Sequence, residues 1–504
     1  MPRPRRARRP PLARALLLAL AVGLLAGGVA EASSSQLVVR GAGFGHGVGM
    51  SQWGARGMAA RGASAEAILR HYYRGTRVSR LTSEPTVRVA LQWGHREATV
   101  AGASSIGGLR VRPDRSYRLR RAGSGVRITT AGAKPRRVGR APSGVRVTGP
   151  VPLRVAGRAA DGVVDGTFRG ALEVLPDGDG VLVVNELGLE DYVRGVITGE
   201  SPADWPAAAL RAQAIAARTY AITSSVGGRP FTQWPDVRSQ VYRGVAGETA
   251  TGDAAVRATA RRVVTVGGRP VTTYFFAASG GRTEDVEHVF GGEPRSWLRS
   301  VRDPAEGNAP LHRWRRTFSR ASADRRVARF GVGALRGIEV LRTGSSPRIV
   351  RARVTGTRGS KVVDGGALQR AFALPDRWAT FTATSISGCL RPRLGPPATS
   401  TAAGTLAADD PAAGALELLD RGARDLAARI EAAERRRRIR RGCRLVGTLA
   451  PPPARRARLQ VRRGERWRTV RRVTLDGRGR FDVTVPRGGR WRLAAGPVAT
   501  PPTG

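Results

Sequence analysis

The sequence predicts an α+β protein with a β-rich core that contains one buried helix, then a helical linker and a small all-β C-terminal module. Three observations predict this class. Short stretches in which apolar and polar residues alternate occupy much of residues 33–390, as in half-buried strands. Residues 207–222 are apolar nearly all around a helix, as expected of a helix packed on most sides. After residue 442, short strand-like runs recur between turn residues.

Residues 1–32 have the features of a signal peptide. Six arginines fall within the first fourteen residues, an apolar run covers residues 15–29, and Ala30-Glu-Ala32 is a small-residue cleavage site. The alternative is an uncleaved anchor, but the run is short for a span of about 20 residues. We therefore expect export and cleavage, with no membrane span left in the mature chain.

The strands of the core are predicted wherever apolar alternation is bounded by Gly, Pro or Asp. The clearest of them are residues 87–91, 109–112, 144–147 and 182–184. Residues 391–442 form the predicted linker, which starts with a stretch rich in Pro, Ala and Thr. An amphipathic helix follows, with apolar residues every three or four positions from Leu416 to Ile430. We interpret it as a spacer, because fewer than three heptads are present for a coiled coil.

Residues 443–504 predict a small β-sandwich. Its strands are expected at residues 459–461, 467–470, 473–475, 481–485 and 491–493. The chain has two cysteines, Cys389 and Cys443. They either form one disulfide, as an exported chain allows, or remain two isolated thiols, and the sequence does not decide between these alternatives. Neither has the neighbouring Cys or His residues of a zinc site.

The chain is strongly basic, with 86 Lys and Arg against 38 Asp and Glu and a formal charge of +48. Only Lys134 and Lys361 are lysine, a skew typical of a high-G+C genome. Neither zinc-finger spacing nor an RNP motif accompanies the charge, so we expect no specific nucleic-acid partner. A salt-dependent attraction to polyanions is what the charge does predict.

The most informative stretch runs from Glu190-Asp-Tyr-Val-Arg-Gly-Val-Ile-Thr-Gly-Glu200 through the predicted buried helix. Polar residues on such a helix must find partners or line a cleft, since an unpaired buried polar group costs about 1–3 kcal/mol. The polar residues of this helix are Arg211, Gln213, Arg218, Thr219 and Tyr220.

Glu200 is expected where the chain enters this helix. At that position the helix dipole would stabilise the carboxylate and lower its pKa, which is unfavourable for a proton donor. A catalytic role would therefore require burial, for example beside Trp205 or Tyr220, that outweighs the dipole.

This stretch resembles the signature of the stage II sporulation protein D (SpoIID/LytB) family. The resemblance continues at Ser239-Gln-Val-Tyr242-Arg-Gly, at Tyr274-Phe-Phe-Ala-Ala-Ser279-Gly-Gly-Arg-Thr283-Glu and at Trp297-Leu-Arg-Ser-Val-Arg-Asp-Pro304. A further block is Gly43-Phe-Gly-His46-Gly-Val-Gly-Met-Ser-Gln52. In the family pattern this block usually follows the core, whereas here it comes first. The resemblance thus implies a circular permutation, in which residues 33–84 complete a core formed by residues 85–390.

The resemblance implies a lytic transglycosylase that cuts peptidoglycan strands lacking stem peptides between MurNAc and GlcNAc. The family glutamate corresponds to Glu200, which would act first as acid and then as base while the sugar closes to 1,6-anhydroMurNAc. No metal or cofactor is implied, and the closely spaced Cys and His zinc cluster of some members is absent from the sequence. The residues implied in substrate binding are His46, Gln52, Gln213, Arg218, Tyr220, Tyr242, Ser279 and Thr283.

Each of these residues also has a structural interpretation. Arg218 can pair with Glu190 or Asp191 in the core, and the two tyrosines can be core aromatics with a satisfied hydroxyl. Ser279 lies in a Ser-Gly-Gly turn without a nucleophile elbow. A loop histidine is expected at position 46 rather than a metal ligand, because the other histidines are scattered along the chain.

Two other functions remain open at this point. The LytB side of the family resembles a non-catalytic enhancer of a cell-wall amidase, and an adhesive wall protein would use the basic surface and the β module. A hydrolase that pairs Glu200 with Asp191 or Asp204 is a variant of the enzyme hypothesis. The expected partners are glycan strands and an amidase, and the expected location is the cell wall or the exterior.

Overall fold

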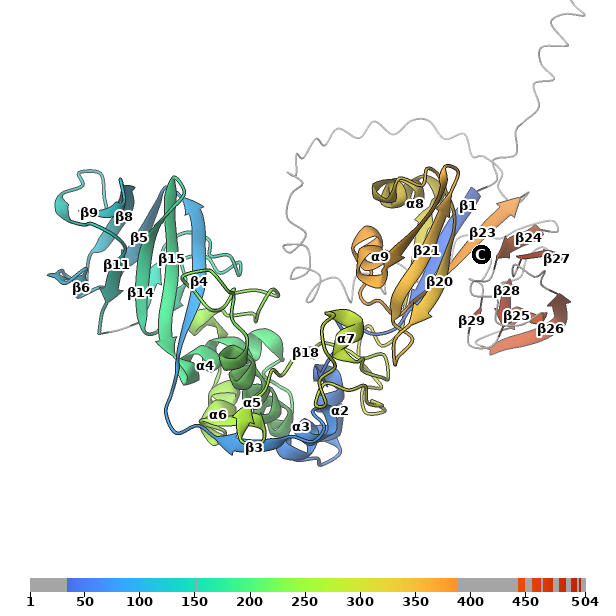
Figure 1. Cartoon of the computed structure of the whole chain (residues 1–504), viewed down its shortest axis with the longest axis horizontal. Coiled ribbons are helices and arrows are strands. Elements are labelled where there is room, and N and C mark those ends of the chain that lie inside the picture. Colours follow the sequence, from blue (N-terminus) through green and yellow to red (C-terminus); the bar gives the residue numbers. More distant parts are fainter. Residues whose placement is uncertain are drawn as a thin grey trace, which may run out of the picture.

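The computed structural model describes residues 34–150 and 152–387 and six strands of the C-terminal region. The predicted leader, the linker helix and the side chains of both cysteines lie outside the described residues. Two β-rich lobes flank a layer of helices, and the C-terminal strands lie beside the second lobe (Figure 1). Within these ranges no helix combines the length and the apolar character that crossing a bilayer requires.

The first lobe consists of two antiparallel six-stranded sheets. One has the order β4-β15-β14-β11-β6-β7, and the other the order β10-β9-β8-β5-β12-β13. Alternate residues of these strands, such as Val181 and Val183, are buried in a common core with helices α4 and α5. The strands are β4 (Thr86–His95), β5 (Glu97–Ala101), β6 (Ser105–Ile106), β7 (Leu109–Arg110), β8 (Ser116–Ala122), β9 (Gly125–Thr130), β10 (Arg137–Ala141), β11 (Val145–Thr148), β12 (Leu153–Val155), β13 (Thr167–Phe168), β14 (Ala171–Asp177) and β15 (Gly180–Gly188).

The helical layer surrounds α5 (Ala207–Thr223), which confirms the buried helix predicted from the sequence. Helix α5 packs against four other helices, because small Ala side chains on most of its surface allow close approach. Those helices are α2 (Gln52–Ala60), α3 (Ala65–Tyr72), α4 (Leu189–Glu200) and α6 (Ala250–Ala258). The layer also holds β2 (Met50–Ser51), β3 (Arg77–Arg80), η1 (Gly244–Gly247), β16 (Arg262–Val266), β17 (Arg269–Pro270), β18 (Phe275–Phe276) and α7 (Val286–Val289).

The second lobe has its own apolar core, between a sheet that includes β1 and the hairpins β20-β21-β22. Strand β1 pairs with β23, and Ser34 lies opposite Ile386. The first and last described strands of this region are therefore neighbours, and the circular permutation stays a prediction. The elements are β1 (Ser34–Gly41), β19 (Trp314–Ser319), α8 (Arg320–Val327), η2 (Ala328–Phe330), β20 (Leu335–Thr343), β21 (Ile349–Gly356), β22 (Gly359–Asp364), α9 (Gly365–Phe372) and β23 (Ala379–Ser387).

The C-terminal strands form a four-stranded sheet and also extend the sheet of the second lobe, since β24 pairs with β23 and β27 with β24. The two strands predicted at residues 467–470 and 473–475 are one continuous strand, β26. The bounds are β24 (Cys443–Thr448), β25 (Arg456–Arg463), β26 (Arg466–Thr474), β27 (Arg480–Val485), β28 (Trp491–Ala495) and β29 (Val498–Ala499).

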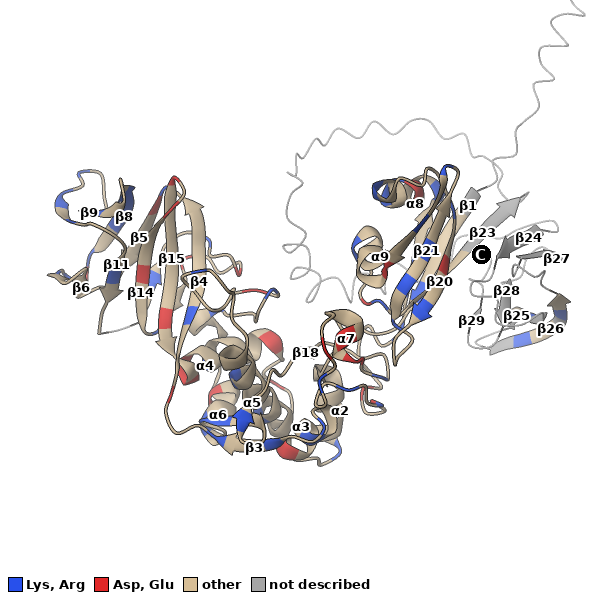
Figure 2. Cartoon of the chain, in the orientation of Figure 1, with Lys and Arg blue, Asp and Glu red and all other residues tan. Residues whose placement is uncertain are grey.

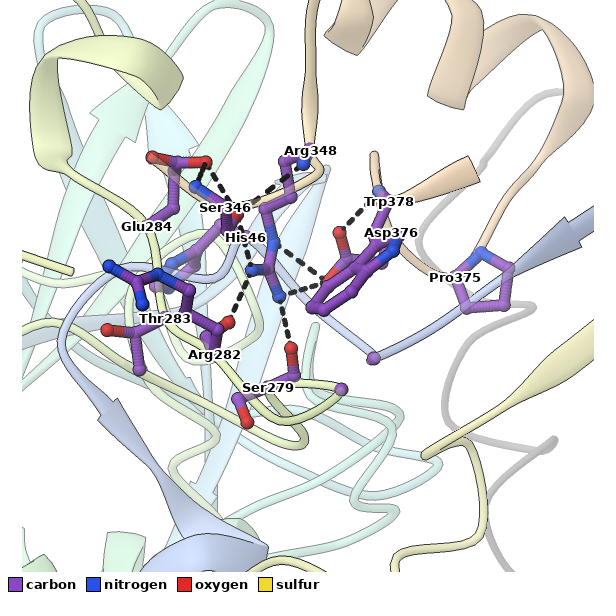
Figure 3. Close-up of polar contacts among 12 residues, drawn as sticks. His46, Ser279, Arg282, Thr283, Glu284, Ser346, Arg348, Pro375, Asp376 and Trp378 are labelled. Atoms are coloured by element: carbon purple, nitrogen blue, oxygen red, sulfur yellow. Dashed lines mark hydrogen bonds and ion pairs between the residues drawn. The ribbon is translucent and has the colours of Figure 1, made fainter. Parts of the chain in front are cut away.

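The second lobe is fixed to the helical layer by Arg348, which is 1% exposed (Figure 3). Its guanidinium forms an ion pair of 2.8 Å with Asp376 and donates to the carbonyls of Ser279 at 2.9 Å and Arg282 at 2.7 Å. A Cβ at Gly47 would lie 2.3 Å from Arg348 Nε, so only glycine lets the N-terminal segment pass this side chain. We call this group of contacts the Arg348 junction.

Removal of the Asp376 carboxylate should destabilise the protein strongly. Asp376→Ala leaves the buried Arg348 charge without its counter-ion, and we expect a loss of about 3–5 kcal/mol in the free energy of unfolding. Urea denaturation measures it. The control is Glu339→Ala, whose carboxylate is 61% exposed beside Arg353 and should be worth less than about 1 kcal/mol. Equal losses in the two variants would contradict the role of the junction.

Candidate functional site

Glu200 is the last residue of α4, which corrects the expectation that it opens the buried helix. The chain is already helical from Leu189, and α5 begins only at Ala207, after Pro206. The carboxyl therefore lies at the negative end of a helix dipole, which disfavours its charge. Two glycines and β-branched residues near the end of α4 have low helix propensity, and this misled the sequence analysis.

Those two glycines bring a main-chain donor to Glu200. A Cβ at Gly199 would lie 2.7 Å from the Val241 carbonyl oxygen, and one at Gly195 would lie 2.6 Å from the Tyr242 ring. Without side chains there, the segment around residue 241 packs directly on α4. The Val241 N–H consequently donates to Glu200 Oε1 at 2.7 Å.

The second oxygen of Glu200 is contacted from the N-terminal segment. Gln52 Nε2 donates to Glu200 Oε2 at 3.3 Å. Ser51 caps α2 by accepting from the Gly54 N–H, so that Gln52 is the first residue of the helix and is 6% exposed. The structure thus brings together Gln52 and Glu200, two of the residues that the family resemblance implied.

Burial raises the pKa of the Glu200 carboxyl above its ordinary value of 4.5. The hydrogen bonds from Val241 and Gln52 and the charge of Arg243 act in the opposite direction, but burial is the largest effect. Among the described residues Glu200 forms no ion pair. A carboxyl whose pKa is raised and whose hydrogen bonds come from neutral amide donors is suited to give up a proton and to take one back.

Aromatic side chains occupy the elements next to this carboxyl, on α2 and α5 and in the loop before α5. Trp53 follows Gln52, is half-buried, and lies edge-to-face with Trp205 at 5.2 Å between ring centroids. Tyr220 is also half-buried, and the charge of Glu200 contributes to its raised pKa, although burial is the main cause. The sequence analysis did not select Trp53, although it is the next residue of the Gln52 block.

Gln213 is 1% exposed, and neither atom of its amide has a hydrogen-bond partner among the described residues. It precedes Tyr220 by seven residues, about two helical turns, so both lie on one face of α5. A buried amide without a protein partner is costly unless water or a ligand satisfies it.

His46 lies apart from Glu200, against the rings of Tyr274, Phe276 and Phe290 at centroid distances of 5.9, 5.4 and 5.2 Å. Its Nδ1 accepts from the Val48 N–H at 3.1 Å. Burial lowers the pKa of His46 to about 4, so that the imidazole is neutral at physiological pH. The loop histidine that the sequence analysis expected is thus part of an aromatic cluster.

Four residues implied in substrate binding lie inside the protein, each at most 1% exposed. Arg218 pairs with Glu190 at 2.7 Å, and the Tyr242 hydroxyl donates to Asn185 Oδ1 at 2.6 Å. The Ser279 hydroxyl donates to Asp303 at 2.9 Å, and that of Thr283 accepts from the Val301 N–H at 2.8 Å. Protein groups thus already satisfy these four polar side chains, and their role in substrate binding stays a prediction.

Three potential metal ligands, Glu284, Asp285 and His288, have ligand atoms within 4.8 Å of one another. The Glu284 carboxylate accepts from the N–H groups of Ser345 at 2.8 Å and Ser346 at 3.1 Å, and from the Ser346 hydroxyl at 2.6 Å. These hydrogen bonds attach the loop before β21 to the helical layer. The Ser346 hydroxyl also accepts from Arg348 Nη1 at 3.1 Å, so Glu284 adjoins the Arg348 junction (Figure 3).

Comparison with known proteins assigns a family to the part of the chain that holds this site. Residues 177–266, which include α4, Glu200 and α5, match the family model of SpoIID, the stage II sporulation protein. This match confirms, for residues 177–266, the resemblance to the SpoIID family inferred from the sequence.

Each of three curated relatives matches about a quarter of the chain. An uncharacterized protein of Brachyspira hyodysenteriae is 41% identical over 25% of this chain and 34% of its own. Stage II sporulation protein D of Bacillus subtilis is 30% identical over 29% of this chain and 47% of its own length. An amidase enhancer of Bacillus subtilis is 34% identical over 26% of this chain and 17% of its own length. The chain thus spans at most about half of these relatives, and no solved structure matches it significantly.

The raised pKa of Glu200 predicts a pH-dependent stability difference. The folded state holds the proton more tightly than the unfolded chain, so wild-type stability falls as pH rises from about 4.5 towards the raised folded pKa. Glu200→Gln has no such proton, and its amide still accepts from Val241. We expect the variant to match the wild type at pH 4 and to exceed it at pH 7, as measured by urea denaturation.

Asp179→Asn, at a fully exposed carboxylate, controls for the loss of one negative charge. The opposite outcome, a Glu200→Gln protein that loses stability relative to wild type between pH 4 and pH 7, would show that the fold favours the carboxylate and would contradict the assignment of a proton donor.

Proposed function

We propose that this protein is an exported lytic transglycosylase that cleaves the MurNAc–GlcNAc bonds of stem-peptide-free peptidoglycan strands at the cell wall. The observation that supports it most is the environment of Glu200, a carboxyl with a raised pKa and two amide donors. The family match over residues 177–266 is consistent with this role.

The proposed reaction needs one carboxyl group. Protonated Glu200 gives its proton to the glycosidic oxygen as the bond to MurNAc C1 breaks. The resulting carboxylate, held by Val241 and Gln52, then removes the proton of the MurNAc C6 hydroxyl, whose oxygen closes on C1. The products are a 1,6-anhydroMurNAc end and a free GlcNAc end, and Glu200 is protonated again.

A conventional hydrolase would need a second carboxylate about 5–9.5 Å from the first. Asp191 lies in the first turn of α4, nine residues before Glu200, which corresponds to about 13 Å along the helix. Its side chain also pairs with Arg194. The geometry therefore argues against Asp191 as the second carboxylate. Asp204, exposed in the segment between α4 and α5, is the other candidate of the hydrolase variant, which product analysis tests.

Gln213, Trp53 and Tyr220 are the proposed substrate contacts around the acid. The unpartnered amide of Gln213 offers both a donor and an acceptor, as the hydroxyl and acetamido groups of the sugars require. The half-buried rings of Trp53 and Tyr220 offer apolar surfaces to the C–H face of a pyranose.

A second candidate function is the enhancement of a cell-wall amidase, since one relative is named an amidase enhancer. An enhancer would bind the glycan or the amidase without needing a proton donor. The raised pKa of Glu200 favours the enzyme, because a shift towards the proton-donating form serves acid catalysis and is not needed by a pure binding site.

Glu200→Gln should abolish cleavage while the protein stays folded. Loss of general acid–base catalysis typically lowers kcat about 10²–10⁴-fold. Mass spectrometry of stem-peptide-free strands treated with wild-type protein should show 1,6-anhydroMurNAc ends, which the variant does not produce. The matched control is Asp191→Asn, which changes a carboxylate on the same helix and should keep activity within a few-fold of wild type.

Two outcomes would contradict the proposal. Reducing MurNAc ends among the wild-type products would indicate a hydrolase. Wild-type protein that releases no saccharide, yet stimulates a peptidoglycan amidase equally well with or without the Glu200→Gln substitution, would indicate the enhancer.

A further inference from the structure

A pocket of about 620 Å³ lies where α5 ends, between the loops that flank β18 and α7. This volume is within the usual range of about 300–1,000 Å³ for ligand sites. Glu200, Gln52 and Gln213 do not line it, so it is separate from the site already described. Its aromatic lining is Tyr274, Phe290 and Trp297, and its polar lining includes Thr223, Glu293 and Arg295.

The aromatic walls are held in fixed positions. The Trp297 indole N–H donates to the Thr272 carbonyl at 3.0 Å. Tyr274 and Phe290 lie 4.8 Å apart between ring centroids, and His46 supports Phe290 from behind at 5.2 Å. Fixed rings lose little conformational entropy when a ligand stacks on them.

Phe290 is 50% exposed, which is unusual for a large apolar ring beside a preformed cavity. Gly291 and Gly292 follow it with φ of 75° and 77°, and a Cβ at either would meet open space. The turn thus presents the ring at the rim of the pocket without adding further side chains.

The composition of the pocket matches a saccharide. A pyranose has one apolar C–H face, for which an aromatic ring is the complement, and a rim of hydroxyl groups. Glu293 and Arg295 supply an acceptor and several donors at the exposed edge of the pocket. Arg295 also lies over the Trp297 ring at 5.8 Å, so that its planar group is part of the same wall.

The pocket adjoins the face of α5 that carries Gln213 and Tyr220. The Tyr220 ring lies 5.9 Å from the Tyr274 ring of the pocket between ring centroids. Ile222 and Thr223, which follow it on α5, already line the pocket. A linear polymer bound at Glu200 can therefore run along α5 past Tyr220 into the pocket.

We propose that the pocket is a distal saccharide subsite, which holds glycan units beyond the bond cleaved at Glu200. This proposal rests on the proposed function, since it takes the polymer at Glu200 to be a glycan. The subsite adds affinity for long strands and takes no part in the proton transfers.

The test measures binding apart from cleavage. Oligosaccharides of β-1,4-linked N-acetylglucosamine, a dimer and a hexamer, are titrated calorimetrically into full-length Glu200→Gln protein and into Glu200→Gln/Phe290→Ala. We expect the hexamer to bind at least tenfold more tightly than the dimer, and Phe290→Ala to remove most of this difference. Because Phe290 is half exposed, the substitution should leave thermal unfolding nearly unchanged.

Two further variants make the result specific. Trp297→Phe keeps an aromatic wall and should retain at least part of the advantage of the hexamer. Leu341→Ala removes an exposed apolar side chain on β20, outside the pocket, and should change nothing.

Every other outcome overturns the subsite. It fails if the Glu200→Gln protein does not bind the hexamer more tightly than the dimer, or if Phe290→Ala leaves that difference intact. It also fails if free stem peptide binds the pocket and the hexamer does not. Cleavage assays separate the two proposals. If the protein passes the binding test but has no lytic activity, only the proposed function is refuted. If Phe290→Ala cleaves long strands normally and with an unaltered KM, only the subsite is refuted.

Discussion

The burial of Arg348 is the constraint on which the arrangement of the second lobe and the N-terminal segment depends. A guanidinium has five N–H groups, and leaving any of them unpaired in the interior is costly. Here the three nitrogens make five hydrogen bonds, two to Asp376 and one each to Ser346, Arg282 and Ser279. Asp376 and Ser346 belong to the second lobe, and Ser279 and Arg282 belong to the helical layer. All the N–H groups of Arg348 therefore find acceptors only when the second lobe is docked on the helical layer.

The Arg348 junction also determines the site at Glu200. Gly47 passes the guanidinium at a distance that excludes any side chain, and five residues later the chain enters α2 at Gln52. The N-terminal segment therefore reaches Glu200 in one orientation, with the Gln52 amide on one oxygen, while Val241 reaches the other from a distant part of the sequence. Burial raises the pKa of this carboxyl. The two neutral donors and the charge of Arg243 lower it, but their effect is smaller.

Sequence analysis predicted the parts that depend on local pattern. Apolar alternation located β4 and β15, and the small residues of α5 indicated its burial. The pattern failed at α4, because Gly195 and Gly199 lower helix propensity yet are needed for the approach of residues 241 and 242. The Val241 contact has no sequence signal at all, since every residue carries a backbone N–H. For Arg218, the ion pair with Glu190 was one of two alternatives that only the three-dimensional structure could separate.

One loop connects both ends of the proposed binding surface. His46 supports the Phe290 and Tyr274 rings of the pocket, and Gln52, six residues later, contacts Glu200. Burial lowers the pKa of His46 to about 4, so the imidazole that supports the aromatic wall is neutral at physiological pH. The neighbours of this segment explain why it is rich in glycine. Within seven residues, from His46 to Gln52, it passes a buried arginine, supports an aromatic wall and places an amide beside a carboxyl. A side chain at Gly45 would collide with Phe276, one at Gly47 with Arg348, and one at Gly49 with Tyr274.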